Sequence, residues 1–79
     1  MTTMWRLPQA LAESGKTRSP WYADIAYGTM TKAVKIGPRA AAWPAEEVRA
    51  VIDARIAGAD TKRLRELVDR LHAARKGVQ

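Results

Sequence analysis

The segment from Lys16 to Gly28 is marked at both ends as one short helix, and the rest of the chain is organised around it. Ser19 is suited to the N-cap because its hydroxyl can accept a hydrogen bond from a free amide of the first turn. Pro20 then occupies the first helical position, where its missing N–H costs nothing, and Gly28 can adopt the left-handed conformation that ends a helix. Lys16 and Arg18 lie just ahead of the helix, where its dipole disfavours cations. We therefore expect these two charges to serve an anionic partner.

An earlier helix is predicted to begin near Leu7-Pro8 and to end at Ser14-Gly15. Leu7 and Leu11 give it a narrow apolar stripe. The second helix starts only a few residues later, and two short helices joined by a tight, glycine-containing turn form a helix-turn-helix unit. Residues 1–4 are expected to be a loose end.

The hydrophobic pattern changes from helical to alternating after the second helix. Residues 31–36 place Val34 and Ile36 on one face of a strand. Gly37-Pro38 interrupts this run, and residues 39–43 can return as the second strand of an antiparallel hairpin. A hairpin directly after a helix-turn-helix unit is a wing. A hairpin that only covers the core is the alternative, but the lysine and arginine residues here favour contact with phosphate.

Two further helices are predicted in the second half of the chain. Pro44 begins the third helix, which ends around Gly58. Its apolar residues keep the spacing of a buried face. Asp60 is expected to cap a fourth helix from about Thr61 to Lys76.

The fourth helix carries a heptad-like seam made of Leu64, Leu67, Leu71 and Ala74. We expect this seam to pack back on the domain, and pairing with a second copy of the chain is the alternative. His72 lies beside the seam and is interpreted as a surface or boundary residue. The chain is thus divided into a winged helix-turn-helix DNA-binding domain over residues 5–58 and a C-terminal helix over residues 60–76.

The composition favours a binding protein over an enzyme. The chain of 79 residues has a net charge of +6, no cysteine and a single histidine. It lacks a glycine-rich phosphate loop, paired carboxylates on one element and a nucleophile triad, so neither catalysis nor a cofactor or metal is expected. Asp53 with His72 is the one conceivable acid–base pair. No apolar run could span a membrane and no secretory leader is evident, which predicts a cytoplasmic protein.

Much of the apolar fraction is alanine, so the core must depend on few large side chains. A deep enzyme pocket is hard to build from them, whereas the basic charge favours nucleic acid. These expected core residues are Trp5, Leu7, Leu11, Trp21, Ile25, Val34, Ile36, Trp43, Val48, Val51, Ile52 and Ile56.

Candidate DNA contacts lie on the second helix and on the hairpin. Arg18 can donate two hydrogen bonds to guanine in the major groove. Tyr22 can reach a phosphate or a thymine methyl, or can lie at the rim of the core. Asp24 either points sideways or accepts a hydrogen bond from a cytosine amine. The full set of candidates is Lys16, Arg18, Ser19, Tyr22, Lys32, Lys35 and Arg39.

Four pieces of the sequence carry a family resemblance: Arg6-Leu7-Pro8 with Leu11-Ala12, Thr17-Arg18-Ser19 with Tyr22, Gly28-Thr29 followed by Lys32–Arg39, and Trp43 before Glu47-Val48. From about Trp5 to Ala57 the chain resembles the AlpA family of small phage-type regulators. These proteins have a winged helix-turn-helix related to excisionases and to MerR-type DNA-binding domains. The resemblance implies a sequence-specific protein of bacterial or phage origin that binds double-stranded DNA.

Three functions remain open within this interpretation. The resemblance implies a transcriptional regulator, with Arg18, Ser19 and Tyr22 in the recognition segment and Lys35 and Arg39 in the wing. The same fold serves an excisionase-like architectural factor that bends DNA. A third hypothesis is a module that keeps the fold but binds protein through the fourth helix. It is motivated by Pro20, Ala23 and Asp24, which depart from the family pattern.

Overall fold

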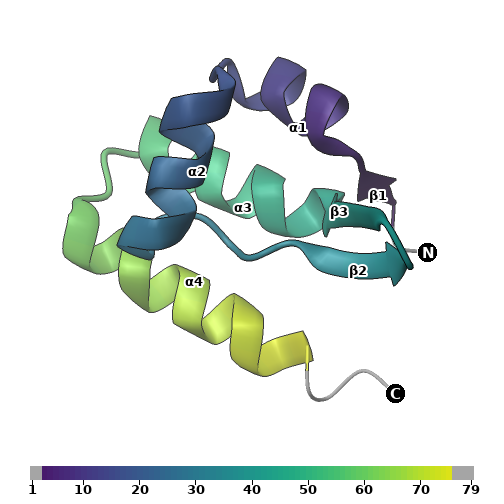
Figure 1. Cartoon of the computed structure of the whole chain (residues 1–79). Coiled ribbons are helices and arrows are strands. Elements are labelled where there is room, and N and C mark those ends of the chain that lie inside the picture. Colours follow the sequence, from purple (N-terminus) through teal and green to yellow (C-terminus); the bar gives the residue numbers. More distant parts are fainter. Residues whose placement is uncertain (1–2, 76–79) are drawn as a thin grey trace.

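The computed structural model describes residues 3–75, and over this range the chain is mainly helical with one small antiparallel sheet (Figure 1). This confirms the predicted combination of helices with a β-hairpin. The elements in chain order are β1 (Met4–Trp5), α1 (Leu7–Ser14), α2 (Arg18–Tyr27), β2 (Val34–Gly37), β3 (Ala40–Pro44), α3 (Ala45–Ile56) and α4 (Thr61–Arg75). No helix in the described range is both long and apolar enough to cross a membrane.

Helix α2 ends as predicted but begins earlier. Gly28 has a φ of +86° and follows the last helical residue, so its left-handed conformation ends the helix. The expected N-cap at Ser19 is wrong, because Thr17 holds that position and Arg18 already lies in the first turn. The amide of Trp21 donates to the Thr17 carbonyl at 3.2 Å. The amides of a first turn lack intrahelical acceptors, so the missing N–H of Pro20 at the third helical position removes no helical hydrogen bond.

The sheet has the strand order β1-β3-β2, with both pairings antiparallel. The predicted hairpin is present as β2 and β3. The expectation of a loose N-terminus is wrong for the described residues 3–4, because Met4 pairs with Pro44 in the sheet and the Ala45 amide donates to the Thr3 carbonyl at 2.7 Å. Residues 1–2 lie outside the described range. A two-residue strand has too few positions to show a period, so only its partner reveals it.

A register irregularity in the hairpin changes which side chains face the core. Lys35 pairs with Ala41, but Gly37 pairs with Ala40, so the residue between Lys35 and Gly37 has no partner on β3. Such a bulge breaks the strict alternation of faces along a strand. Val34 is half-buried, whereas Ile36 is 49% exposed. The predicted core position of Ile36 is therefore wrong.

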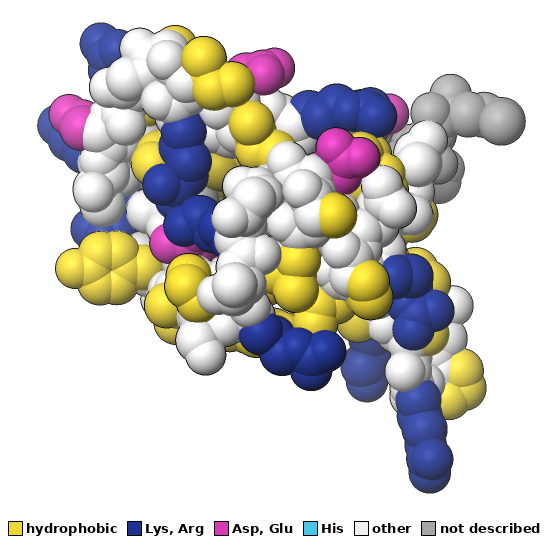
Figure 2. Space-filling view, turned by 90° about the horizontal axis from the view of Figure 1, so that it is seen from above, with side chains coloured by type: hydrophobic (Ala, Val, Ile, Leu, Met, Phe, Trp, Pro, Cys, Tyr) yellow, Lys and Arg dark blue, Asp and Glu magenta, His cyan; other side chains and the backbone are white. Residues whose placement is uncertain are grey.

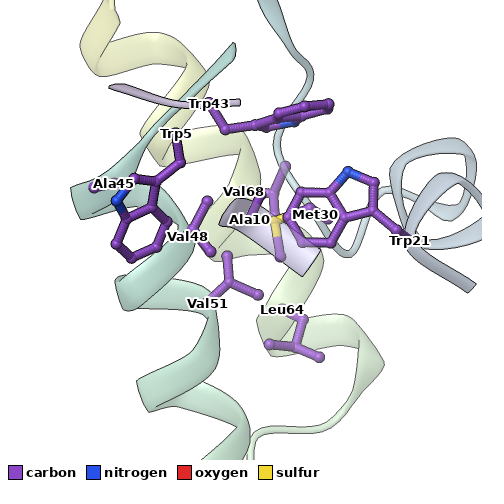
Figure 3. Close-up of a cluster of buried hydrophobic side chains, with 10 residues drawn as sticks. All are labelled: Trp5, Ala10, Trp21, Met30, Trp43, Ala45, Val48, Val51, Leu64 and Val68. Carbon is purple, nitrogen blue, oxygen red and sulfur yellow. The ribbon is translucent and has the colours of Figure 1, made fainter. Parts of the chain in front are cut away.

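The core is built around two tryptophans from different elements. The rings of Trp21 and Trp43 meet edge to face with their centroids 5.3 Å apart, and Figure 3 shows the smaller side chains gathered beside them. The indole N–H of Trp43 donates to the Thr31 carbonyl at 3.0 Å. Ile56, predicted to be buried, is 79% exposed at the end of α3. Met30 and Val68 are buried core residues that the sequence patterns did not select; the whole cluster is Trp5, Ala10, Trp21, Met30, Trp43, Ala45, Val48, Val51, Leu64 and Val68.

Helix α4 packs against the rest of the chain. Asp60 caps it as predicted, because its carboxylate accepts a hydrogen bond from the Arg63 amide at 2.9 Å. Leu64 and Val68 belong to the same core as α2 and α3, while Leu67 and Leu71 pack partly buried against it. The packing role predicted for the seam is thus observed for Leu64, Leu67 and Leu71, whereas Ala74 is exposed. The expected last helical residue, Lys76, lies outside the described range.

Candidate nucleic-acid interface

The N-terminal end of α2 presents polar side chains to solvent. Arg18 and Ser19 are exposed and Tyr22 is 50% exposed, while Trp21 on the same helix is fully buried. Trp21 therefore anchors α2, and the opposite side of its first turns stays accessible. Ser19 lies inside the helix and is not the N-cap residue. Its hydroxyl is therefore not used to cap the helix.

The carboxylate of Asp24 is paired with two cations of the same chain. Its Oδ2 lies 2.6 Å from Nζ of Lys16 and 3.3 Å from Nη2 of Arg55 on α3. Of the two orientations considered for Asp24, the structure shows the sideways one. Lys16, which was predicted to contact DNA, is engaged in this pair and is partly buried. The negative charge of α2 is thereby balanced by two cations of the same chain.

The hairpin and the segment that leads into it carry three exposed cations. Lys32 precedes β2, Lys35 lies on β2 and Arg39 lies in the turn before β3, and all three are exposed. Within residues 3–75, neither these three side chains nor that of Arg18 lies in an ion pair. Lysine and arginine side chains without a carboxylate partner are available to phosphate groups.

Basic groups line the side of the molecule on which α2 and β2 lie. This side faces the reader in Figure 1 and forms the lower edge of Figure 2. Several dark-blue groups follow that edge, and the acidic groups visible in Figure 2 lie elsewhere in the view. Positive charge is therefore present along this side of the domain, and further dark-blue groups lie at other edges of the view.

The backbone of Lys32 is held by α4. Its N–H donates to Nε2 of His72 at 3.0 Å, and its carbonyl accepts from Nη2 of Arg75 at 2.7 Å. Arg75 also makes a bidentate ion pair with Glu47 of α3, whose carboxylate is largely buried. His72 and Arg75 were not selected for this role by sequence reasoning. No local signal exists for it, because the contacts join residues some forty positions apart.

His72 must be neutral to accept this hydrogen bond. Burial is the largest cause that lowers the pKa of His72 below its ordinary value of 6.5, and the charge of Arg75 adds to it. Lys32 lowers this pKa further, whereas the carboxylates of Glu47 and Asp69 oppose the change. The net direction favours the neutral imidazole that the Lys32 amide requires.

The C-terminal end of α2 is also tied to α4. Nε of Arg65 donates to the Tyr27 carbonyl at 2.9 Å, and its guanidinium lies 4.9 Å from the centre of the Tyr27 ring. A cation above an aromatic face adds to the hydrogen bond. Tyr27 and Arg65 were also missed by the sequence patterns, which gave no reason to pair them.

The predicted acid–base pair, Asp53 with His72, is not brought together in the described residues. A shallow groove between α3 and α4 is lined by Ala54, Leu67, Asp53 and Arg70, among others. Asp53 faces this groove, whereas His72 faces Lys32, and no hydrogen bond joins the two within the described residues. No cluster of metal-ligating side chains is found in the same range.

Comparisons of the chain with protein-family models, with curated proteins and with solved structures gave no match. Any functional conclusion therefore depends on the residues and geometry described above.

Proposed function

We propose that this protein binds double-stranded DNA sequence-specifically as a transcriptional regulator of phage type. In this proposal α1 and α2 form the helix-turn-helix unit and the β2–β3 hairpin is the wing. The N-terminal end of α2 enters the major groove, and the wing lies on the phosphate backbone. The resemblance to AlpA-type regulators agrees with this order of elements.

One observation carries the proposal: the exposed cations of α2 and the hairpin have no acidic partner in the described structure, whereas the one acid of α2 has two basic partners. Asp24 on its own would repel phosphate. Its ion pairs with Lys16 and Arg55 remove that obstacle. Positive charge from Arg18 and from the hairpin can then act on DNA without opposition from the same helix.

The two elements supply different parts of recognition. Arg18 in the first turn of α2 is placed to read guanine through two hydrogen bonds, which distinguishes base pairs. Lys35 and Arg39 on the hairpin contact phosphate, which adds affinity and fixes orientation without reading sequence. Ser19 and Tyr22 flank Arg18 and complete the surface of α2 that faces the groove.

A single copy of such a domain covers little DNA. Single modules bury about 600–1,000 Å² of protein surface, which limits the number of base pairs that one copy reads. We therefore expect a site with repeated half-sites occupied by paired copies of the chain.

DNA selection with the purified protein at a stated salt concentration is the first test, since phosphate contacts make affinity depend on salt. We expect enrichment of a defined motif. Uniform, weak binding that unrelated DNA fully displaces would refute sequence specificity.

Paired variants then test the surface. Arg18→Ala combined with Arg39→Ala should weaken binding to the selected site well over tenfold, at about 1–3 kcal/mol for the base contact. The matched control is Arg63→Ala combined with Arg70→Ala, which removes the same charge from the α3–α4 groove. Equal losses in the two double variants would show that only net charge matters, and no loss in either would refute the DNA-binding proposal.

A further inference from the structure

Helix α4 makes backbone hydrogen bonds to both parts of the proposed DNA-binding surface. Arg65 donates to the carbonyl of Tyr27 at the end of α2. His72 and Arg75 hold the N–H and the carbonyl of Lys32, just before β2. Figure 1 shows α4 passing beneath α2 and beneath the segment that leads into β2. One helix thus contacts the last turn of α2 and the start of the hairpin.

The face of α4 that makes these contacts is fixed to the core. Arg65 and His72 are seven residues apart in sequence, which places them on the same side of a helix two turns apart. Leu64 and Val68 lie between or beside them and are buried in the core. Because these buried side chains fix α4 to the core, the polar side chains of α4 that contact α2 and Lys32 have a fixed position.

The hydrogen bonds to Lys32 use its backbone and leave its side chain exposed. A single residue held at both its N–H and its carbonyl has a fixed peptide orientation on each side. Lys32 is two positions before the first residue of β2, so its orientation sets the direction in which the hairpin leaves the core. The position of Lys35 and Arg39 relative to Arg18 follows from that direction.

We propose that Arg65, His72 and Arg75 of α4 are positioning residues that hold the hairpin and α2 in the mutual geometry needed to bind DNA. This inference rests on the proposed DNA-binding function, since it concerns the same surface. The Glu47 carboxylate is part of the arrangement, because its bidentate pair with Arg75 orients the guanidinium toward the Lys32 carbonyl.

The hydrogen bond to His72 also makes the arrangement sensitive to pH. Protonated imidazole has no acceptor nitrogen, so it cannot receive the Lys32 N–H. The charged groups that face His72 are Arg75 and Asp69 on α4, Glu47 on α3, and Lys32. Since the folded-state pKa of His72 is lowered, the contact is complete above the ordinary value of 6.5 and is lost as the pH falls through the lower folded-state pKa. A surface histidine near DNA has the opposite effect, because its protonation adds positive charge.

The first experiment measures hydrogen exchange of individual amides by NMR in the full chain without DNA. His72→Phe keeps an aromatic ring but removes the acceptor, and we expect the Lys32 amide to exchange about tenfold faster. His72→Gln offers a carbonyl oxygen and should restore part of the protection. The Val51 amide in the core serves as the internal control and should be unchanged. An unchanged Lys32 amide in His72→Phe would overturn the proposal, and equal acceleration at Val51 would show general destabilisation instead.

The second experiment measures affinity for the selected DNA site. Arg65→Gln and Arg75→Gln should each weaken binding about three- to tenfold, and Arg70→Gln, which removes the same charge from the groove side of α4, should have a smaller effect. As the pH falls below the ordinary histidine value of 6.5 and through the lowered pKa of His72, binding by the wild type should weaken more than binding by His72→Phe. Equal losses in all three arginine variants, or tighter binding by the wild type at low pH, would overturn the positioning role.

The two experiments separate this inference from the proposed function. If the wild type enriches no DNA motif and binds no DNA, the proposed function fails, and amide exchange at Lys32 still decides whether α4 holds the hairpin. If the wild type binds DNA and the α4 variants bind equally well, the DNA-binding function stands and the positioning role is refuted.

Discussion

Replacing Asp24 by asparagine should strengthen DNA binding, and the ion pairs of this carboxylate determine by how much. Its Oδ2 lies 2.6 Å from the Lys16 ammonium and 3.3 Å from the Arg55 guanidinium. Asparagine has nearly the same shape and keeps an acceptor oxygen, but it carries no charge. In the variant the Lys16 side chain is free to reach a phosphate near the N-terminal end of α2.

The expected gain follows from counterion release. Each added phosphate contact makes the slope of log affinity against log salt steeper by about 0.9. One additional contact from Lys16 therefore raises the advantage of Asp24→Asn over the wild type by about three- to fourfold when salt falls from about 200 mM to about 50 mM. The cost to folding is small, because partly exposed ion pairs contribute about 0.2–1 kcal/mol each.

Fluorescence anisotropy over a salt series measures both affinity and slope. The control is Asp24→Asn combined with Lys16→Ala, which should return the slope to that of the wild type. Urea unfolding of each variant checks that all are folded. Weaker binding by Asp24→Asn, with lost preference at a cytosine, would refute the reasoning and show that the carboxylate reads a base.

Two further predictions concern the stability of the core at Trp43 and Thr31. Trp43→Phe removes the indole N–H that binds the Thr31 carbonyl and should destabilise the fold by about 1–3 kcal/mol in urea unfolding; an unchanged midpoint would contradict this. The Thr31 hydroxyl is buried and has no hydrogen-bond partner among the described residues, so Thr31→Val, with the same branched shape, should stabilise the protein by about 1 kcal/mol. A lower midpoint for Thr31→Val would show that the hydroxyl is satisfied by a buried water.

The elements whose signals are local could be predicted from the sequence. Gly15 and Gly28 both have positive φ and end their helices where glycine was expected to. Asp60 caps α4 three residues ahead of the amide it binds, and Gly37-Pro38 marks the hairpin. Each of these features depends on a few neighbouring residues, so the chain itself carries the information.

Predictions that relied only on the periodic spacing of apolar residues were less successful, because they did not include the elements that pack nearby. Ile36 fits the alternation of a strand, yet the bulge in β2 turns it outward. Ile56 fits the helical spacing of α3 but lies in the last turn, where no element covers it. Ser19 and Thr17 are both residue types that favour the N-cap, so the sequence alone does not distinguish them; in the structure Thr17 holds that position.

The candidate site could likewise be predicted from the sequence only in part. Exposed cations on α2 and on the hairpin were evident from charge and turn signals, so Arg18, Lys35 and Arg39 could be selected from the sequence. The prediction that Lys16 contacts DNA took no account of an ion pair with Asp24. The structure instead joins the two, and the arginine that shares the carboxylate comes from another helix.

The sequence by itself determined where several helices end and where basic residues gather along the chain, because those properties arise within a few residues of chain. Only the tertiary structure decided how the surface is supported. Arg65 reaches Tyr27, His72 reaches Lys32 and Arg75 reaches Glu47 across 38, 40 and 28 positions of sequence. Hydrogen bonds between such distant residues have no periodic signature, and they exist only because the shared core brings α4 beneath α2 and the hairpin.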